Sequence, residues 1–347
     1  MKVDDFEFKL PHALIAQAPV QTRDQARLLV LDRVKEISTH TTVSLLADYF
    51  QPGDVLALNN TKVFPARLYG HRIPSGGSVK CLLMQEINPE HWDALVHPGQ
   101  KLGVGEKILF EGNGRQLFGE VVSRSAFGRR VVRLWSDQGD PWEAIDIIGH
   151  IPLPPYIKRP DDQRDRDRYQ TVYARTRGSV AAPTAGLHFT TELFKSLASR
   201  NVIRAELTLH VGYGTFKPLR TDRVEDHVID AESFEISEET AHVINRALDE
   251  NRRVIAVGTT TTRALETSVR HGGGRIVPGK GVSDLFIYPG FSFSAVSGIM
   301  TNFHLPKSSL LMLVCAFAGR DCLLAAYDEA VRMNYRFYSY GDAMLIV

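Results

Sequence analysis

Apolar runs of strand length alternate with helical repeats over most of the chain. Val254 to Val257 is continuously apolar, as in a buried strand, and a helical repeat of apolar residues precedes it after the N-cap residue Ser237. Leu285 to Tyr288 has the composition of a further strand. Two helices are expected near the end of the chain, from about Ser308 to Gly319 and from an Asp321 cap to about Met333. The alternation predicts an α/β layer architecture.

Residues from about 63 to 149 show a different pattern, in which short apolar segments are separated by turns containing glycine or proline. Lys107 to Phe110, Phe118 to Val122 and Arg130 to Leu134 are strand candidates of a few residues each, as expected for a small barrel. We therefore expect a discontinuous α/β domain, residues 1–62 and 150–347, with an inserted small all-β barrel domain, residues 63–149.

The composition is that of an ordinary soluble protein, with 44% hydrophobic and 23% charged residues in a chain of 347. The first ten residues alternate charged with aromatic positions and lack the apolar core of a signal peptide. The longest apolar run, Leu310 to Ala318, is too short to span a bilayer. We therefore expect a cytoplasmic protein without membrane contact, and a monomer.

The three cysteines, Cys81, Cys315 and Cys322, are too few and too scattered for a zinc site or a disulfide framework, so no metal is expected. The net charge is only +1, so a nucleic-acid partner would have to bind a local basic surface. The densest basic segment lies between residues 158 and 177, where aspartates are interleaved with the cations. This segment is either a phosphate-binding surface or a solvated loop joined by salt bridges.

Two distant segments each place a histidine just before a helix start. In residues 180–189, a run of small residues with one proline and one glycine leads to His188. In residues 300–307, a polar cluster that includes Asn302 leads to His304 ahead of a helix. We call such a loop, which leads from a strand into a helix, a corner. One corner of this kind by itself indicates tight packing around a core histidine. Two corners with the same ingredients suggest that both contribute to one site.

A third corner lies where the apolar strand from Val254 runs into a glycine, four threonines and Arg263 at a helix start. Free amides in the first turn of a helix, joined by threonine hydroxyls, suit a carboxylate or a phosphate group. The same threonine run is also compatible with an ordinary N-cap.

Further motifs extend over the whole chain. They are Leu58 to Thr61, Leu153 to Ile157, Arg168 to Tyr173, Leu209 to Phe216, Tyr335 to Phe337 and Tyr340 to Met344. Together with the three corners, these motifs resemble the S-adenosylmethionine:tRNA ribosyltransferase-isomerases of queuosine biosynthesis, the QueA family. The resemblance implies transfer and isomerisation of the ribosyl part of S-adenosylmethionine onto 7-aminomethyl-7-deazaguanine at the tRNA wobble position. Epoxyqueuosine-tRNA, adenine and methionine are the implied products, so S-adenosylmethionine is a consumed substrate and no cofactor is expected.

The implied reaction needs a base near C5′, whose proton is made acidic by the sulfonium, and a proton donor for the departing adenine. It also needs groups that hold the methionine tail and the ribose. The catalytic candidates are His188, His210, His227, Glu232 and His304. The substrate-binding candidates are Asn60, Thr184, Gly186, Tyr213, Thr259, Thr260, Thr261, Arg263 and Asn302. The tRNA-binding candidates are Lys158, Arg159, Arg164, Arg166, Arg168 and Tyr169.

Two positions depart from the family pattern. Lys80 lies in a predicted strand of the inserted domain where an acidic residue is expected, and we interpret it as a surface variation. The second departure is Asp230. After Asp226 and His227, the family usually continues with methionine, histidine and a small residue before a glutamate, whereas this chain has Asp230 in place of the histidine. Glu232 remains, so a carboxylate role survives while a histidine role at position 230 does not. Two alternatives are an S-adenosylmethionine-dependent RNA methyltransferase and a non-catalytic RNA-binding protein. The first is disfavoured because no G-x-G-x-x-G fingerprint follows a strand.

Overall fold

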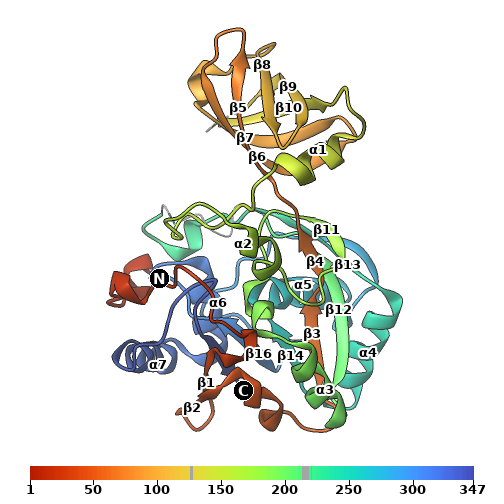
Figure 1. The fold of residues 1–347 in the computed structure, drawn as a ribbon. Coiled ribbons are helices and arrows are strands. Elements are labelled where there is room, and N and C mark those ends of the chain that lie inside the picture. The colour runs from red at the N-terminus through yellow and green to blue at the C-terminus, as the bar shows by residue number, and fades with distance from the viewer. Residues whose placement is uncertain (126–127, 213–218, 220) are drawn as a thin grey trace.

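The chain forms a nine-stranded mixed sheet with helices packed on it and a closed six-stranded barrel at one end (Figure 1). A computed structural model describes residues 1–125, 128–212, 219 and 221–347. The strands are β1 Arg27–Asp32, β2 Ile37–Thr42, β3 Val55–Asn59, β4 Thr61–Val63, β5 Arg67–Ile73, β6 Ser78–Asn88, β7 His91–His97, β8 Lys107–Gly112, β9 Arg115–Arg124, β10 Arg129–Trp135, β11 Thr176–Ser179, β12 Ile203–Leu209, β13 Glu232–Ile236, β14 Val254–Val257, β15 Gly279–Ser283, β16 Gly298–Asn302 and β17 Ala343–Ile346. The α-helices are α1 Pro141–Ile148, α2 Gln163–Arg168, α3 Thr191–Ser199, α4 Glu238–Asp249, α5 Thr259–His271, α6 Ser309–Ala318 and α7 Arg320–Arg332.

The large sheet has the strand order β15-β13-β12-β3-β14-β16-β17-β1-β2. The four neighbours β12, β3, β14 and β16 are parallel, so their carboxyl ends lie along one edge of the sheet. Every residue of β3, β14 and β16 is buried, as expected for parallel strands that are covered on both faces. In α/β sheets this carboxyl edge is where ligands usually bind.

The barrel closes in the order β10-β7-β6-β5-β8-β9 and is antiparallel throughout. The chain enters it after β4 and leaves it after α1, which packs against β8 and β9. Burial alternates along β7, so one face of the strand fills the barrel interior, which contains the fully buried Phe110 and nearly buried Trp92. The predicted α/β fold with a small β-barrel is confirmed, while the domain boundaries at residues 62/63 and 149/150 stay a prediction.

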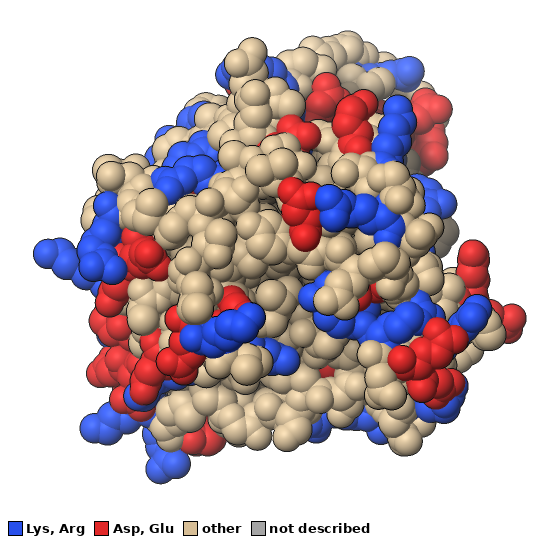
Figure 2. All heavy atoms as spheres, turned by 90° about the horizontal axis from the view of Figure 1, so that it is seen from below, with Lys and Arg blue, Asp and Glu red and all other residues tan. Residues whose placement is uncertain are grey.

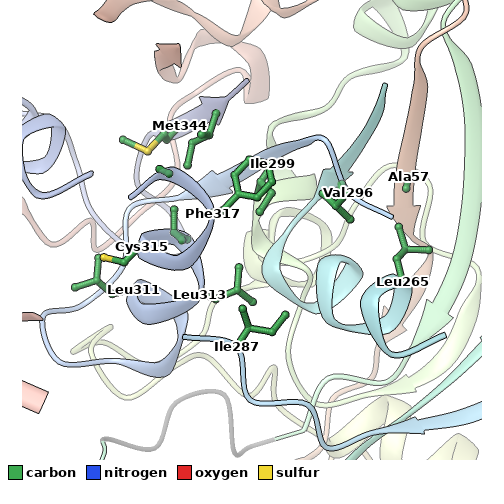
Figure 3. Close-up of a cluster of buried hydrophobic side chains, with 14 of the residues drawn as sticks. Ala57, Leu265, Ile287, Val296, Ile299, Leu311, Leu313, Cys315, Phe317 and Met344 are labelled. Atoms are coloured by element: carbon green, nitrogen blue, oxygen red, sulfur yellow. The ribbon is translucent and has the colours of Figure 1, made fainter. Parts of the chain in front are cut away.

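The main core lies between the large sheet and the helices that cover it (Figure 3). Leu265 of α5 and Leu311, Leu313 and Phe317 of α6 are buried in one cluster with Ile299 of β16. Burial of a side chain of this size stabilises a fold by about 1.5–3 kcal/mol. This packing fixes the start of α5 and the segment between β16 and α6 against the carboxyl edge of the sheet.

Several predicted helix starts are confirmed. The hydroxyl oxygens of Thr190, Ser237 and Ser308 accept hydrogen bonds from backbone N–H groups in the first turns of α3, α4 and α6. The Asp321 cap was wrong, because α7 begins at Arg320 and the Asp321 carboxylate pairs with the Arg320 guanidinium.

The strand predicted at Leu285 to Tyr288 was also wrong. The edge strand β15 instead covers Gly279–Ser283, and the Leu285 carbonyl accepts a hydrogen bond from Arg263. A side chain of α5 therefore takes the place of a neighbouring strand as the partner of this backbone.

Among the described helices, none is by itself both long and apolar enough to cross a membrane. Helices α6 and α7 satisfy the length and composition test only as a pair, bent by 114°.

Candidate active site at the carboxyl edge of the sheet

A cavity of about 710 Å³ lies at the carboxyl edge of the parallel strands. Its lining includes residues 181–185, residues 258–260 at the start of α5, and residues 301–308 after β16. The N-terminal segment contributes Val3, His12, Ile15 and Gln17. Ligand pockets usually have volumes of about 300–1,000 Å³, so this cavity is large enough for a small-molecule substrate.

A short chain of hydrogen bonds joins the loop before α3 to the end of β16. The Thr184 hydroxyl donates to Asn302 Oδ1 at 2.8 Å, and Asn302 Nδ2 donates to His188 Nε2 at 3.1 Å. An amide nitrogen only donates, so His188 Nε2 accepts, which corresponds to a neutral imidazole protonated at Nδ1. The pKa of His188 is lowered from 6.5 to about 4, mainly by burial, and the charges of Arg336 and Arg23 contribute in the same direction.

His304 lies in the cavity lining itself, whereas His188 lies one hydrogen bond behind it. His304 Nε2 is 2.8 Å from the Thr301 hydroxyl, and the backbone N–H of His304 donates to the Tyr327 hydroxyl at 3.0 Å. Burial lowers the pKa of His304 from 6.5 to about 3. Both imidazoles are therefore neutral near pH 7, and the one at position 304 is placed to act on a molecule in the cavity.

The start of α5 forms part of the cavity wall. Gly258 has a φ of 91°, which lets the chain turn sharply from β14 into the helix. The Thr261 hydroxyl donates to the Val257 carbonyl at 2.7 Å, so it stabilises the turn and does not face a ligand. Thr259 and Thr260 line the cavity. First-turn amides lack partners within the helix, so this end suits a carboxylate.

Arg263 and Glu232 form a buried ion pair in which both side chains are about 5% exposed or less. Arg263 Nη1 donates to Glu232 Oε2 at 2.6 Å, and its other nitrogens donate to the carbonyls of Leu285 and Ser283 at 3.0 Å. Glu232 Oε1 accepts from the Gly212 N–H at 3.0 Å. Neither residue lines the cavity. The roles of Arg263 and Glu232 in binding and catalysis stay predictions. The contacts that the structure shows link α5 to β13.

Three further candidates lie outside the cavity lining. His210 Nδ1 is 2.8 Å from the Thr61 hydroxyl, and the ring of His227 packs edge-on against Phe286. Burial lowers the pKa of both imidazoles. The Asn60 amide donates to Glu206 Oε2 at 3.2 Å and accepts from the Thr208 hydroxyl at 2.7 Å.

Gly186 is required for packing against the loop before β11. A Cβ at this position would lie 2.1 Å from the Tyr173 hydroxyl oxygen and 2.9 Å from a methyl carbon of Thr171. The predicted substrate-binding residue Tyr213 lies outside the described residues. For none of these positions does the placement test the predicted role.

The basic segment before β11 contains two kinds of side chain. Arg166 donates to the carbonyls of Asp146 and Gly149, and Arg168 donates to those of Val20 and Gln21. These two arginines hold the segment to α1 and to the N-terminal region. The contacts of Arg166 and Arg168 therefore stabilise the fold.

The remaining members of this segment differ in exposure. Arg159 pairs with the buried Asp165 at 2.6 Å, whereas the Arg164 side chain is 85% exposed and pairs with Asp162. Lys158 lines the cavity. Tyr169 has no exposed surface, so contact with a nucleic acid would require this region to open. Lys158 and Arg164 are therefore the cations of this group best placed for an external partner.

Sequence reasoning did not assign roles to three cavity residues, Lys307, Tyr338 and Ser339. Lys307 Nζ pairs with Asp4 at 2.8 Å and Glu7 at 2.5 Å, which ties the N-terminal segment to the corner after β16. Tyr338 and Ser339 lie between two of the family motifs, Tyr335 to Phe337 and Tyr340 to Met344. Their place between these motifs was the signal in the sequence that could have marked them as candidate site residues. Their proximity to the other corners depends on the fold.

Among residues 1–125, 128–212, 219 and 221–347, no group of three His, Cys, Asp or Glu side chains is arranged to hold a metal ion. The cavity is instead lined by neutral imidazole, hydroxyl and amide groups, lysines and apolar side chains. These features define an α/β protein with a cavity at the carboxyl edge of its parallel strands and a β-barrel attached.

The chain belongs to the family of queuosine biosynthesis proteins, whose family model matches residues 3–346. It is similar to S-adenosylmethionine:tRNA ribosyltransferase-isomerases from Carboxydothermus hydrogenoformans and Desulforamulus reducens, with 50% and 48% identity over 347 residues and complete coverage of both chains. It is also similar to the crystal structure of S-adenosylmethionine tRNA ribosyltransferase from Thermotoga maritima. That match has 36% identity and a TM-score of 0.56, and it covers 99% of this chain and 100% of the other. The resemblance inferred from the motifs is thereby confirmed.

Proposed function

We propose that this protein transfers the ribosyl moiety of S-adenosylmethionine to 7-aminomethyl-7-deazaguanine at the wobble position of tRNA and isomerises it. The products are epoxyqueuosine-tRNA, adenine and methionine. The observation that carries this proposal is similarity along the whole chain, at about half of all positions, to relatives named for that reaction. S-adenosylmethionine is a consumed substrate, and no cofactor or metal is included in the proposal.

The cavity offers groups for each part of the proposed reaction. His304 is neutral near pH 7 and is the proposed group for moving a proton at the ribosyl part of the substrate. The amides at the start of α5, with Thr259 and Thr260, are proposed to bind the methionine carboxylate. Thr184 and Asn302 are proposed to contact the ribose hydroxyls, with His188 fixing the orientation of the Asn302 amide.

The transferred ribosyl group is attached to a tRNA base, so that base must leave its stack and enter the cavity. The face seen in Figure 2 carries Lys and Arg side chains interspersed with Asp and Glu, without one continuous basic area. Attraction to the tRNA phosphates is therefore proposed to come from local groups, with Lys158 at the cavity and Arg164 nearby in sequence as the first candidates. We further propose that the protein acts as a cytoplasmic monomer.

The purified protein is expected to release adenine and methionine in equal amounts from S-adenosylmethionine when tRNA carrying 7-aminomethyl-7-deazaguanine is present, without added metal. Chromatography of the small-molecule products measures this directly. Methyl transfer would instead release S-adenosylhomocysteine, and a non-catalytic RNA-binding protein would release neither product. Unmodified tRNA serves as the control, since it lacks the aminomethyl nitrogen that attacks the ribosyl group.

Replacing Lys158 or Arg164 by alanine is expected to weaken tRNA binding and to lower the slope of log affinity against log salt by about one for each phosphate that the variant no longer binds. The reason is that each cation bound to a phosphate releases a counterion. Binding isotherms at several salt concentrations measure the slope. Arg246→Ala is the matched control, because Arg246 is also an exposed arginine paired with a carboxylate, on α4. If the slope of log affinity against log salt is unchanged in both variants, Lys158 and Arg164 do not bind tRNA phosphates and the basic segment has a structural role only.

A further inference from the structure

Two tyrosines form a stacked pair in the lining of the cavity. The ring centroids of Tyr156 and Tyr338 are 4.3 Å apart, and the ring planes differ by 17°. Both residues line the cavity, and Tyr338 is only 6% exposed. The cavity therefore has a rigid aromatic wall in addition to its histidine corners.

The backbone of Tyr338 has an unusual conformation that its surroundings maintain. Its φ is 72°, in the left-handed region that bulky aromatic residues rarely adopt. The Tyr338 N–H donates to the Phe303 carbonyl at 3.0 Å, and the Gly341 N–H donates to the Tyr338 carbonyl at 2.8 Å. Such a conformation persists only where neighbouring contacts impose it, and it is found preferentially at ligand sites. The contact with Phe303 links Tyr338 to the corner that carries His304.

The hydroxyl groups of the two tyrosines differ in their partners. The Tyr156 hydroxyl is hydrogen-bonded to the Ser339 hydroxyl. Among the described residues, none forms a hydrogen bond with the Tyr338 hydroxyl, although this oxygen is buried. A buried hydroxyl without a partner is destabilising in the free protein, so a ligand that reaches this oxygen from the cavity would supply the missing hydrogen bond. Burial raises the pKa of Tyr338, so the phenol stays protonated and acts as a donor.

We propose that the Tyr338 hydroxyl donates a hydrogen bond to a ring nitrogen of the adenine base of S-adenosylmethionine, which lies against the Tyr156–Tyr338 pair. This inference rests on the proposed function, because that function places S-adenosylmethionine in the cavity. A neutral donor beside an aromatic wall matches a purine, whose ring nitrogens accept and whose faces stack. The charged methionine tail is matched by the start of α5 instead. A side chain as buried as Tyr338 is more accessible to a small substrate than to a base attached to a tRNA backbone.

The test is titration calorimetry of the whole protein with adenine, with S-adenosylmethionine and with methionine, for the parent and for Tyr338→Phe. The variant is expected to bind adenine and S-adenosylmethionine about twofold to tenfold more weakly, the range for one neutral hydrogen bond. Methionine binding is expected to stay the same. Tyr173→Phe is the matched control, since Tyr173 also has a buried hydroxyl without a partner among the described residues but does not line the cavity.

Thermal unfolding of the ligand-free proteins separates binding from folding. Both phenylalanine variants should be as stable as the parent or more stable, because each removes an unsatisfied buried hydroxyl. Unchanged adenine affinity in Tyr338→Phe, or a loss confined to methionine, would overturn the proposal. A parent protein that is saturated by S-adenosylmethionine but does not bind adenine at all would overturn it too.

Analogues of S-adenosylmethionine in which one ring nitrogen of adenine is replaced by CH identify the acceptor. The analogues are the 1-deaza, 3-deaza and 7-deaza compounds. One of them is expected to bind the parent protein more weakly than S-adenosylmethionine does. In Tyr338→Phe, the same analogue and S-adenosylmethionine are expected to bind with equal affinity. Additive losses for all three analogues would show that the hydroxyl contacts none of these nitrogens. Product analysis keeps this inference separate from the function: release of S-adenosylhomocysteine would contradict the proposed reaction, whereas the titrations report on the adenine contact alone.

Discussion

Replacing His304 by alanine is expected to lower turnover by about a hundredfold to ten-thousandfold, the range typical for loss of a group that transfers a proton. His304 lines the cavity, and burial lowers its pKa to about 3, so its imidazole is neutral at neutral pH. The measurement is turnover per folded molecule, obtained from adenine release and thermal unfolding on the same preparation. The affinity for S-adenosylmethionine should change much less than turnover.

His188→Ala is the informative comparison, because His188 contacts Asn302 and does not line the cavity. We expect this variant to lose mainly stability, commonly about 1–3 kcal/mol, through the freed Asn302 amide and the space left by the ring. An exposed histidine of the barrel, His97, provides the neutral control when changed to alanine. If His304→Ala unfolds early but reacts at the parent rate per folded molecule, His304 is a packing residue.

The fold was predictable from the sequence wherever local patterns and turn chemistry agreed. A strand at Val254 to Val257, a helix start capped by Ser237 and a helix start near Ser308 were all predicted correctly. The barrel was predictable because its short strands alternate with glycine and proline turns. Leu285 to Tyr288 was not, because a short apolar segment is equally compatible with a strand and with a loop packed on a helix. Its partner is the Arg263 side chain, which no local pattern reveals.

The candidate site was predictable in part, because the carboxyl ends of parallel strands carry the polar corners. Thr184, Thr259, Thr260, Asn302 and His304 line one cavity in the structure. Tyr338 could not be assigned, because its left-handed backbone and its stacking on Tyr156 exist only in the folded chain. The sequence also does not distinguish hydroxyls that face a ligand from those that stabilise a helix. Thr260 and Thr261 are adjacent, yet the second donates to the Val257 carbonyl.

Replacing Arg263 by alanine, or Glu232 by glutamine, is expected to lower the free energy of unfolding by about 3 to 5 kcal/mol. The two side chains are buried and paired at 2.6 Å, so loss of one partner leaves the other as a buried, uncompensated charge. Removal of the hydrogen bonds from Arg263 to the Leu285 and Ser283 carbonyls adds to this effect in the arginine variant. Denaturant unfolding monitored by circular dichroism measures the change. The matched control is Arg275→Ala, because Arg275 and Asp249 form an exposed pair whose loss should change the stability little.

The same variants decide between the structural and the chemical role of Glu232. A double replacement, Glu232→Leu with Arg263→Met, removes both charges and should recover part of the stability, since well-packed apolar residues often replace a buried ion pair at no cost. Recovery should be incomplete, because the Leu285 and Ser283 carbonyls still lose the hydrogen bonds from Arg263. If Glu232 only holds α5 against β13, the double variant should regain turnover together with stability, because the start of α5 is again fixed at the cavity. A double variant that folds stably but releases no adenine would show instead that the Glu232 carboxylate or the Arg263 guanidinium takes part in the reaction.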